Sequence, residues 1–331
     1  MRYRCLGQSG FSVSMLSFGA WQIGDSAFWG ASAAEDAQGA VDEALDAGIN
    51  LFDTAEMYGN GESERLLGQC LGKRRPQVHV ASKVLPENCA PPRMRTSLEN
   101  SLRRLKTDWI DLYQVHWPPR DVPFGDVCGE LLRFQEEGKI RAIGLSNFGP
   151  EDLNEWHAAG GAVSNQVGYN AVFRAVEYDV IPASRAHKLG VLAYMPLMQG
   201  LLAGRYARVE DIPMMRRRSR HFAATRQGTR HEEGGQEQLL MATLAELNEF
   251  AEAVGLSPAV LCVAWLCAQP GVSSVILGAR TPSQLRSNLA AADLDIGPAA
   301  VAQLDEITFP LKHALGTNCD MWETASKSRI H

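Results

Sequence analysis

The chain has 331 residues, of which 45% are hydrophobic and 21% charged, and its net charge is −6. This composition is typical of a globular protein with a large core, and the acidic balance argues against nucleic acid as a partner. The seven cysteines are odd in number and contain no Cys-x-x-Cys pair, which argues against a disulfide framework or a zinc site and favours a reducing compartment. No apolar run has the length of a signal peptide or a membrane span. We therefore expect a cytoplasmic protein without a membrane or nucleic-acid partner.

Short apolar segments alternate with helical segments along most of the chain. Residues 3–13 predict a small hairpin around a Gly-Gln-Ser-Gly turn. Strands are then expected at 13–18, 49–52, 78–82, 110–115, 140–145, 162–165, 191–193 and 275–277. Helices are expected at 33–46, 63–71, 92–105, 126–137, 150–157, 179–188, 238–253, 257–268, 281–291 and 298–306, with Ser257 and Thr281 as N-caps.

Eight strands that each precede a helix predict a single domain over residues 1–331 with the α/β fold of a (β/α)8 TIM barrel. The alternative is an open doubly wound sheet. That fold favours a Gly-x-Gly-x-x-Gly turn after the first strand, whereas this strand ends in Gly-Ala-Trp-Gln-Ile-Gly. The nearest partial match, residues 59–61, lacks the third glycine, so we interpret it as a turn.

Two segments depart from the alternation. The long loop 205–235 contains eight arginines, and it is either a solvated insertion or a loop over an anionic ligand. Residues 310–331 form a C-terminal extension, whose last part, 318–331, is polar with one tryptophan, Trp322. It either folds over the mouth of the barrel or frays.

The strand ends carry polar side chains that can form one active site. Asp53, Lys83 and His116 close consecutive strands, and Tyr58 lies on the loop beside them. Each alone is more often structural, but the carboxyl ends of barrel strands share one rim, so these side chains should converge. The Lys83 ammonium, held by Asp53, should lower the pKa of Tyr58, which is ordinarily about 10. Tyr58 and a neutral His116 can then donate hydrogen bonds to one carbonyl oxygen, which suits hydride addition.

Hydride transfer requires a donor that the protein itself does not supply, and a nicotinamide cofactor would supply it. Other strand ends provide candidate contacts for such a cofactor. Ser146, Asn147 and Gln166 can hydrogen-bond a carboxamide, and Tyr194 can stack on a flat ring. Gly278 and Arg280 precede a helix whose free N–H groups can bind a phosphate. Gln284 and Asn288 lie further along that helix and can meet a purine. The aromatic residues Trp21, Trp29 and Trp117, and Phe28 beside them, offer walls for a substrate.

Taken together, these residues resemble the aldo-keto reductase superfamily over about residues 3–305. The motifs that carry the resemblance are Gly19-Ala20-Trp21; Phe52-Asp53-Thr54-Ala55-Glu56-Met57-Tyr58-Gly59; Ser82-Lys83; Asp111-Leu112-Tyr113-Gln114-Val115-His116-Trp117; Gly144-Leu145-Ser146-Asn147-Phe148; Tyr194-Met195-Pro196-Leu197; Gly200-Leu201-Leu202-Ala203-Gly204; and Ile276-Leu277-Gly278-Ala279-Arg280 with Gln284 and Asn288. The branch that it resembles most includes inositol-operon oxidoreductases, sugar dehydrogenases and potassium-channel β subunits.

The resemblance implies a catalytic tetrad of Asp53, Tyr58, Lys83 and His116, NADP(H) in preference to NAD(H), and no metal. It also implies cofactor contacts beyond those above, at Gly19, Trp21, Asp53, Pro196, Leu197, Gly200, Leu202 and Arg205. Substrate contacts are expected at Trp21, Trp29, Tyr58, His116 and Trp117. Arg205 stands where that branch often has lysine, and residues 216–220 are unusually basic.

Three functions are compatible with these residues. The first is an NADP(H)-dependent reductase or dehydrogenase of an aldehyde, ketone or sugar, with Tyr58 as the general acid and base. The second is a cofactor-binding regulatory module with slow or vestigial reductase chemistry. The third is a Schiff-base aldolase with Lys83 as nucleophile, although its pairing with Asp53 argues against this role.

Overall fold

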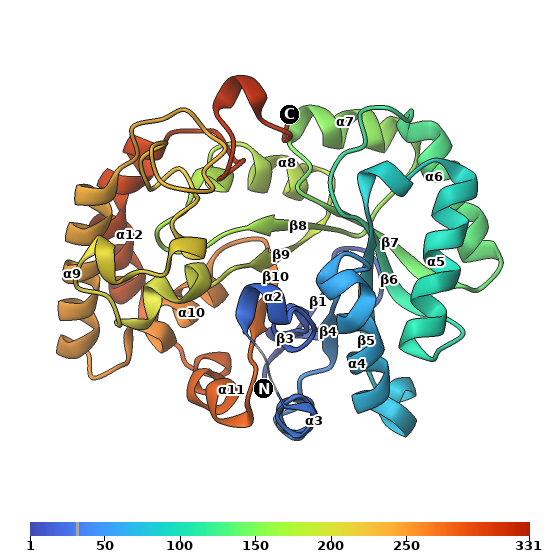
Figure 1. Ribbon diagram of the computed structural model, residues 1–331, viewed down its shortest axis with the longest axis horizontal. Helices are drawn as coiled ribbons and strands as arrows, with labels where there is room; N and C mark the ends of the chain where they lie inside the picture. Colours follow the sequence, from blue (N-terminus) through green and yellow to red (C-terminus); the bar gives the residue numbers. More distant parts are fainter. Residues whose placement is uncertain (31–32) are drawn as a thin grey trace.

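The computed structural model describes residues 1–30 and 33–331. Eight parallel strands at the centre close into a barrel, with helices around it (Figure 1). The strands follow chain order around the barrel, and the last pairs with the first. They are β3 (Leu16–Gly19), β4 (Leu51–Asp53), β5 (His79–Val84), β6 (Ile110–Val115), β7 (Ile140–Ser146), β8 (Ser164–Gly168), β9 (Gly190–Tyr194) and β10 (Val272–Gly278). The predicted (β/α)8 barrel is therefore confirmed.

A separate hairpin, β1 (Tyr3–Cys5) and β2 (Ser12–Ser14), covers the amino-terminal end of the barrel. Its Leu6 and Val13 are fully buried against side chains that fill the barrel interior, including Leu51, Leu112 and Leu192. Apolar side chains thus close this end of the barrel and leave the opposite end for chemistry. The predicted strand 13–18 is divided at Met15, because Ser12–Ser14 pair within the hairpin and Leu16–Gly19 within the barrel.

The helices that surround the barrel agree with the predicted segments within a few residues, apart from the last. They are α3 (Ala34–Asp46), α4 (Glu62–Leu71), α5 (Pro91–Leu105), α6 (Phe124–Glu136), α7 (Pro150–Ala159), α8 (Val180–Ala186), α9 (Glu237–Ala253), α10 (Pro258–Ala268), α11 (Pro282–Leu289) and α12 (Gly297–Leu315). The predicted N-caps are confirmed, because the side chains of Ser257 and Thr281 accept hydrogen bonds from Val260 and Gln284.

Two short helices after β3 were not predicted. They are α1 (Trp21–Gly24) and α2 (Ser26–Trp29), each a single turn that is too short to show helical periodicity in the sequence. Among the residues that the structure describes, no single helix is long and apolar enough to cross a membrane. Within this described part of the chain, only α9 and α10 taken together, with a 93° bend between them, reach the required length and composition.

The C-terminal extension begins later than residue 310. Pro310 lies inside α12, which was expected to end at residue 306 but continues to Leu315. Leu311 and Leu315 are buried in the core, and this packing holds the helix together beyond the proline. The rest of the extension runs across the carboxyl end of the barrel, and the chain ends beside α7 (Figure 1).

The basic loop 205–235 is irregular apart from two short 3₁₀ turns, η6 (Val209–Asp211) and η7 (Met214–Arg216). Its centre is nevertheless buried, since Arg220, His221 and Phe222 are almost inaccessible to solvent. Arg220 donates hydrogen bonds to the carbonyl oxygens of Leu315 (2.7 Å) and Asn318 (2.9 Å). The loop and the extension are therefore packed together, which excludes a freely solvated insertion.

Candidate active site

Lys83, at the end of β5, is fully buried and its ammonium group contacts three oxygens. Its Nζ donates to Asp53 Oδ1 at 2.6 Å, to the carbonyl oxygen of Thr54 at 2.9 Å and to the Tyr58 hydroxyl at 3.4 Å. The structure therefore brings the predicted strand ends together with Tyr58. The three contacts occupy the three ammonium hydrogens, which argues against a nucleophilic amine at this position.

The turn that carries Tyr58 depends on a glycine. Tyr58 begins η1 (Tyr58–Gly61), in which Gly59 has φ +57° and Asn60 has φ +54°. A Cβ atom at Gly59 would lie 2.1 Å from the carbonyl oxygen of Gly24, so a side chain cannot fit there without displacing α1. The close approach of these two segments fixes the direction in which Tyr58 leaves the rim.

The second carboxylate oxygen of Asp53 is held by two amides. Gln166 Nε2 donates to it at 2.8 Å, and Gln114 Nε2 donates at 3.2 Å. Gln114 was not predicted as a site residue. Its position two residues before His116 on one strand is the signal that could have found it, because alternate residues of a strand share a face. The two amides orient Asp53 toward Lys83.

The pKa of Tyr58 is shifted in the direction opposite to the one expected from the sequence, which was a lowering by Lys83. Burial and the nearby carboxylate of Asp53 raise the pKa of Tyr58 well above its ordinary value of 10.0. Desolvation of the phenolate therefore outweighs the attraction of the Lys83 ammonium. The pKa of Lys83 itself is lowered, because the effect of burial exceeds the opposing effect of Asp53. At neutral pH Tyr58 is a protonated phenol and can donate a proton.

His116 faces the edge of the Tyr58 ring, with 5.8 Å between ring centroids. Burial, and secondarily the charge of Lys83, lowers the pKa of His116 well below 6.5. The ring is therefore neutral at pH 7. Among the described residues no hydrogen bond uses either ring nitrogen, so one N–H remains available for a ligand.

A cavity of about 770 Å³ opens in front of Tyr58 and His116. Most of the predicted site residues line it, namely Gly19, Trp21, Trp29, Asp53, Tyr58, His116, Trp117, Ser146, Asn147, Gln166, Tyr194, Pro196, Leu197, Gly200, Arg205, Gly278, Arg280, Gln284 and Asn288. Two predicted residues do not line it. Lys83 lies behind Tyr58 and Asp53, and Leu202 is buried in the core, where its side chain packs instead of facing the cavity.

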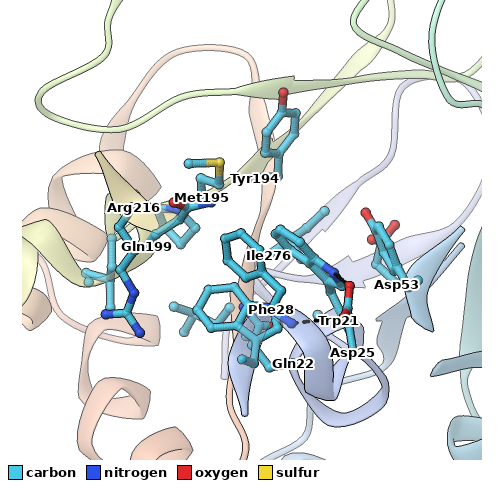
Figure 2. Close-up of a pocket in the computed structure, with 18 of the residues that line it drawn as sticks. Trp21, Gln22, Asp25, Phe28, Asp53, Tyr194, Met195, Gln199, Arg216 and Ile276 are labelled. Atoms are coloured by element: carbon cyan, nitrogen blue, oxygen red, sulfur yellow. Dashed lines mark hydrogen bonds between the residues drawn. The ribbon is translucent and has the colours of Figure 1, made fainter. Parts of the chain in front are cut away.

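Several lining residues were not predicted. They include Gln22, Asp25, Met195, Gln199, Ile276 and Arg329. Figure 2 shows Asp53 on one side of the cavity and Arg216 on the other, with Trp21 and Phe28 between them. Asp25 reaches the cavity because α1 and α2 fold back over the barrel, where Asp25 accepts a hydrogen bond from Trp21 Nε1 at 2.8 Å. No sequence signal marked these two helices.

The amide and hydroxyl groups beside the tetrad form a connected set. Asn147 has a left-handed backbone (φ +62°), and its Nδ2 donates to the carbonyl oxygen of His116 at 3.1 Å. Tyr194 donates its hydroxyl hydrogen to Asn147 Oδ1 at 2.8 Å, and Ser146 donates to the carbonyl oxygen of Gln166 at 3.1 Å. These bonds hold Tyr194 and Asn147 at the wall of the cavity, where a planar ring with an amide substituent can bind.

The cavity also reaches two backbone segments suited to an anion. One is η5 (Met198–Ala203), in which Gln199 and Gly200 have φ +54° and +97°. The other is the start of α11, where Arg280 Nη1 donates to the carbonyl oxygen of Trp29 at 2.5 Å and the Arg280 N–H donates to Gln284 Oε1. The side chain of Thr281 already caps the Gln284 N–H, so the group at this helix start that suits a phosphate is the Arg280 guanidinium.

The described residues contain no group of three or more His, Cys, Asp and Glu side chains that could hold a metal ion.

Comparison with known proteins assigns the chain to a family. The model of the aldo/keto reductase family matches residues 15–308. The chain belongs to the aldo/keto reductase family. Among its relatives, aldo-keto reductase YhdN of Bacillus subtilis is 33% identical over 298 residues, which cover 87% of each chain.

The other comparisons agree with the expected branch of the aldo/keto reductases. A probable voltage-gated potassium channel subunit beta of Oryza sativa is 32% identical and covers 89% of this chain and 92% of its own. Among solved structures, an aldo-keto reductase from Klebsiella pneumoniae in complex with NADPH has a TM-score of 0.72 and 30% identity. It covers 93% of this chain and 95% of its own.

Proposed function

We propose that this aldo/keto reductase transfers a hydride between NADP(H) and the carbonyl or alcohol carbon of an aldehyde, ketone or sugar, with Tyr58 as general acid and base. The observation that carries the proposal is the protonated Tyr58 hydroxyl beside the buried Lys83–Asp53 pair at the floor of an open cavity. An isolated phenol is a weak acid, but one next to an ammonium can release its proton when the substrate oxygen gains charge.

The residues of the cavity fit a nicotinamide dinucleotide along its length. Tyr194, Asn147 and Gln166 lie beside the tetrad, where a nicotinamide ring and its carboxamide would be held. Arg205 and Arg280 also line the cavity, and phosphates would be held beside them. When bound, the cofactor would supply or accept the hydride. The complex of the Klebsiella pneumoniae relative with NADPH supports the choice of NADP(H).

In the direction of reduction, His116 and Tyr58 donate hydrogen bonds to the carbonyl oxygen and orient it. As the carbonyl carbon gains the hydride, Tyr58 donates its proton to the oxygen, and the alcohol forms. The Lys83 ammonium stabilises the phenolate that remains, while Asp53 keeps Lys83 in position. In the direction of oxidation the same phenolate accepts the proton of the alcohol.

The aromatic residues around Tyr58 favour substrates with an apolar or sugar-like face. Trp21 stacks on Tyr58 with 5.6 Å between centroids, and Trp117 lies 6.3 Å from Trp322 of the extension.

All seven cysteines are free thiols, which supports a reducing compartment such as the cytoplasm.

The proposal is tested by assaying the purified protein against a panel of aldehydes, ketones and sugars with NADPH, and of polyols with NADP⁺, each repeated with the NAD forms. We expect a change in nicotinamide absorbance with at least one substrate and a lower KM for the NADP forms. Absence of turnover across the panel with all four cofactor forms would contradict it.

The similarity to a potassium channel β subunit favours one alternative, a cofactor-binding regulatory module with slow or vestigial chemistry. This function predicts cofactor binding and a stable complex with a partner protein, together with negligible turnover across the panel. Multiple turnovers per minute with any panel substrate would exclude it.

A further inference from the structure

The cavity concentrates positive charge in a chain whose net charge is −6. Of the residues that the structure describes, six arginines line it but only two carboxylates, Asp25 and Asp53, and Asp53 is already paired with Lys83. The arginines are Arg205, Arg216, Arg218, Arg230, Arg280 and Arg329. A cleft of one sign of charge attracts ligands of the opposite sign. An arginine that has no carboxylate partner in the protein and lies away from the expected cofactor contacts can bind a charged group of the substrate.

The arginines at the substrate side of the rim differ in their partners. Arg329 forms a bidentate pair with the buried Asp320 at 2.7 and 2.9 Å, and Arg230 pairs with Glu323 at 2.9 Å. Arg218, in contrast, forms no ion pair with any carboxylate of the described residues. Its Nε donates to the carbonyl oxygen of Met215 at 2.9 Å, and its remaining N–H groups are directed to no protein acceptor there.

Arg218 is held at the cavity by its surroundings. Its guanidinium lies 5.3 Å from the centroid of the Phe28 ring, and its side-chain stem packs against Gly228. Gly228 has φ +82°, and a Cβ atom there would lie 3.0 Å from Arg218 Cδ, so a side chain at this position would crowd the arginine. Burial, and secondarily the like charge of Arg230, lower the pKa of Arg218.

A continuous aromatic wall joins Arg218 to the proton donor. Tyr58 stacks on Trp21 at 5.6 Å, and Trp21 stacks on Phe28 at 4.9 Å, with the guanidinium of Arg218 over the far ring. Figure 2 shows Trp21 and Phe28 side by side along the cavity. A substrate whose carbonyl lies at Tyr58 can therefore extend along this wall toward Arg218.

The neighbouring Arg216 belongs to a different part of the cavity. Its guanidinium lies over Trp29 and donates to the Tyr206 hydroxyl, and a Cβ atom at Gly200 would lie 3.3 Å from its Nη1. Arg216 is thus close to η5, the segment assigned above to the cofactor phosphates. Arg218 is grouped instead with Phe28 and Arg230.

We propose that Arg218 binds a carboxylate or phosphate group carried by the substrate, so that the substrates of this enzyme are anionic carbonyl compounds or the corresponding alcohols. This inference rests on the function proposed above and deepens it. Arginine suits the task because its planar N–H groups match carboxylate and phosphate oxygens.

The inference is tested with two matched pairs of substrates, each containing a charged and a neutral aldehyde. The pairs are 4-oxobutanoate with butanal, and glyceraldehyde 3-phosphate with glyceraldehyde. The measured quantity is the ratio of kcat/KM for the charged member to that for the neutral member, in the wild type, in Arg218→Gln and in Arg208→Gln. Arg208 is the matched control on the same loop, because its side chain is 73% exposed and pairs with Asp211 away from the cavity.

We expect the wild type to prefer the charged member of at least one pair, and the responding pair identifies the anion as carboxylate or phosphate. Arg218→Gln should lower that ratio about ten- to hundredfold, the range expected for a lost charge-assisted hydrogen bond. Arg208→Gln should leave the ratio unchanged. An Arg218→Gln ratio equal to that of the wild type in both pairs would overturn the inference, as would an effect of Arg218→Gln confined to NADPH affinity.

Failure of the proposed function is distinguished by a measurement of binding without turnover. Succinate and glycerol 3-phosphate are titrated calorimetrically into the full chain in the presence of NADP⁺. If no carbonyl compound is reduced, binding of either anion to the wild type that is lost in Arg218→Gln still supports the anion site. Equal binding by both proteins, or binding by neither, overturns it.

Discussion

Lys83 and Asp53 form a buried ion pair whose closest atoms are 2.6 Å apart, and the same ammonium lies 3.4 Å from the Tyr58 hydroxyl. The lysine therefore has two neighbours with different roles. Asp53 fixes its position and balances its charge, and Tyr58 is the group that its charge can assist. Separate substitutions should distinguish these contributions.

Replacing Lys83 by methionine should lower both activity and stability. The substitution leaves Asp53 as a buried charge without its partner, which costs about 3–5 kcal/mol of the free energy of unfolding. Adding Asp53→Asn to Lys83→Met should recover much of that loss, because both charges are then removed, but it should not recover turnover. Denaturant unfolding and the kcat of carbonyl reduction measure the two effects. Recovery of turnover in the double variant would show that the ion pair is structural only.

The pH dependence of reduction follows from the two pKa shifts. The neutral form of His116 and the protonated form of Tyr58 are the active forms. Because the pKa of His116 is lowered and that of Tyr58 is raised, both forms persist throughout pH 6.5 to 10.0, the interval between their ordinary values. The kcat/KM for reduction should therefore be flat across this interval and should fall only at more acid or more alkaline pH. The kcat/KM for oxidation should instead increase as pH rises, because oxidation uses the deprotonated form of Tyr58. An inflection for reduction near pH 6.5 that His116→Gln removes would contradict the assignment of His116.

Arg280→Ala should weaken binding of NADP(H) more than that of NAD(H). Arg280 lines the cavity just before α11, where the additional phosphate of NADP(H) is expected. We expect a loss of affinity for NADPH of about ten- to hundredfold with little change for NADH. Fluorescence titration of both cofactors gives the ratio. An unchanged ratio would mean that another residue recognises this phosphate.

Gly149→Ala should displace the end of the extension without disturbing its own backbone. Gly149 has φ −87°, which alanine adopts readily, but its Cβ would lie 2.2 Å from the carbonyl oxygen of His331. Displacement of this segment should loosen Trp322 and Arg329 at the cavity and raise the KM for the carbonyl substrate about tenfold, with NADPH affinity retained.

Gly129→Ala is the matched control for this variant. Gly129 lies within α6, and a Cβ there would meet no atom within 4 Å. It should leave KM unchanged and stabilise the helix by about 0.5–1 kcal/mol. Equal KM values for both variants would show that the extension does not form the substrate wall.

The sequence alone was sufficient to predict the barrel and the convergence of four side chains. Regular alternation of strands and helices defines the topology, and topology places the ends of neighbouring strands on one rim. It was insufficient wherever the outcome depended on contacts between distant segments. The helices α1 and α2 are single turns, and the path of the extension depends on pairs such as Arg220 with the carbonyl of Leu315 and His331 with Asp152.

The direction of the Tyr58 pKa shift could not be predicted either. The sequence shows that a lysine and a carboxylate lie nearby, but the balance between them depends on the depth of burial. Burial of Tyr58 makes desolvation of its phenolate the largest contribution, ahead of the charge of Asp53, and the depth of burial is fixed only in the folded chain.

The central claim is that Tyr58 donates the proton while other residues bind the cofactor. The most direct test combines a fluorescence titration of NADPH with a single-turnover measurement of carbonyl reduction in Tyr58→Phe. Phenylalanine preserves the ring that stacks on Trp21 and removes only the hydroxyl. We predict an NADPH Kd within about twofold of the wild type and a reduction rate about a thousandfold lower. Reduction by Tyr58→Phe at the wild-type rate would contradict the account.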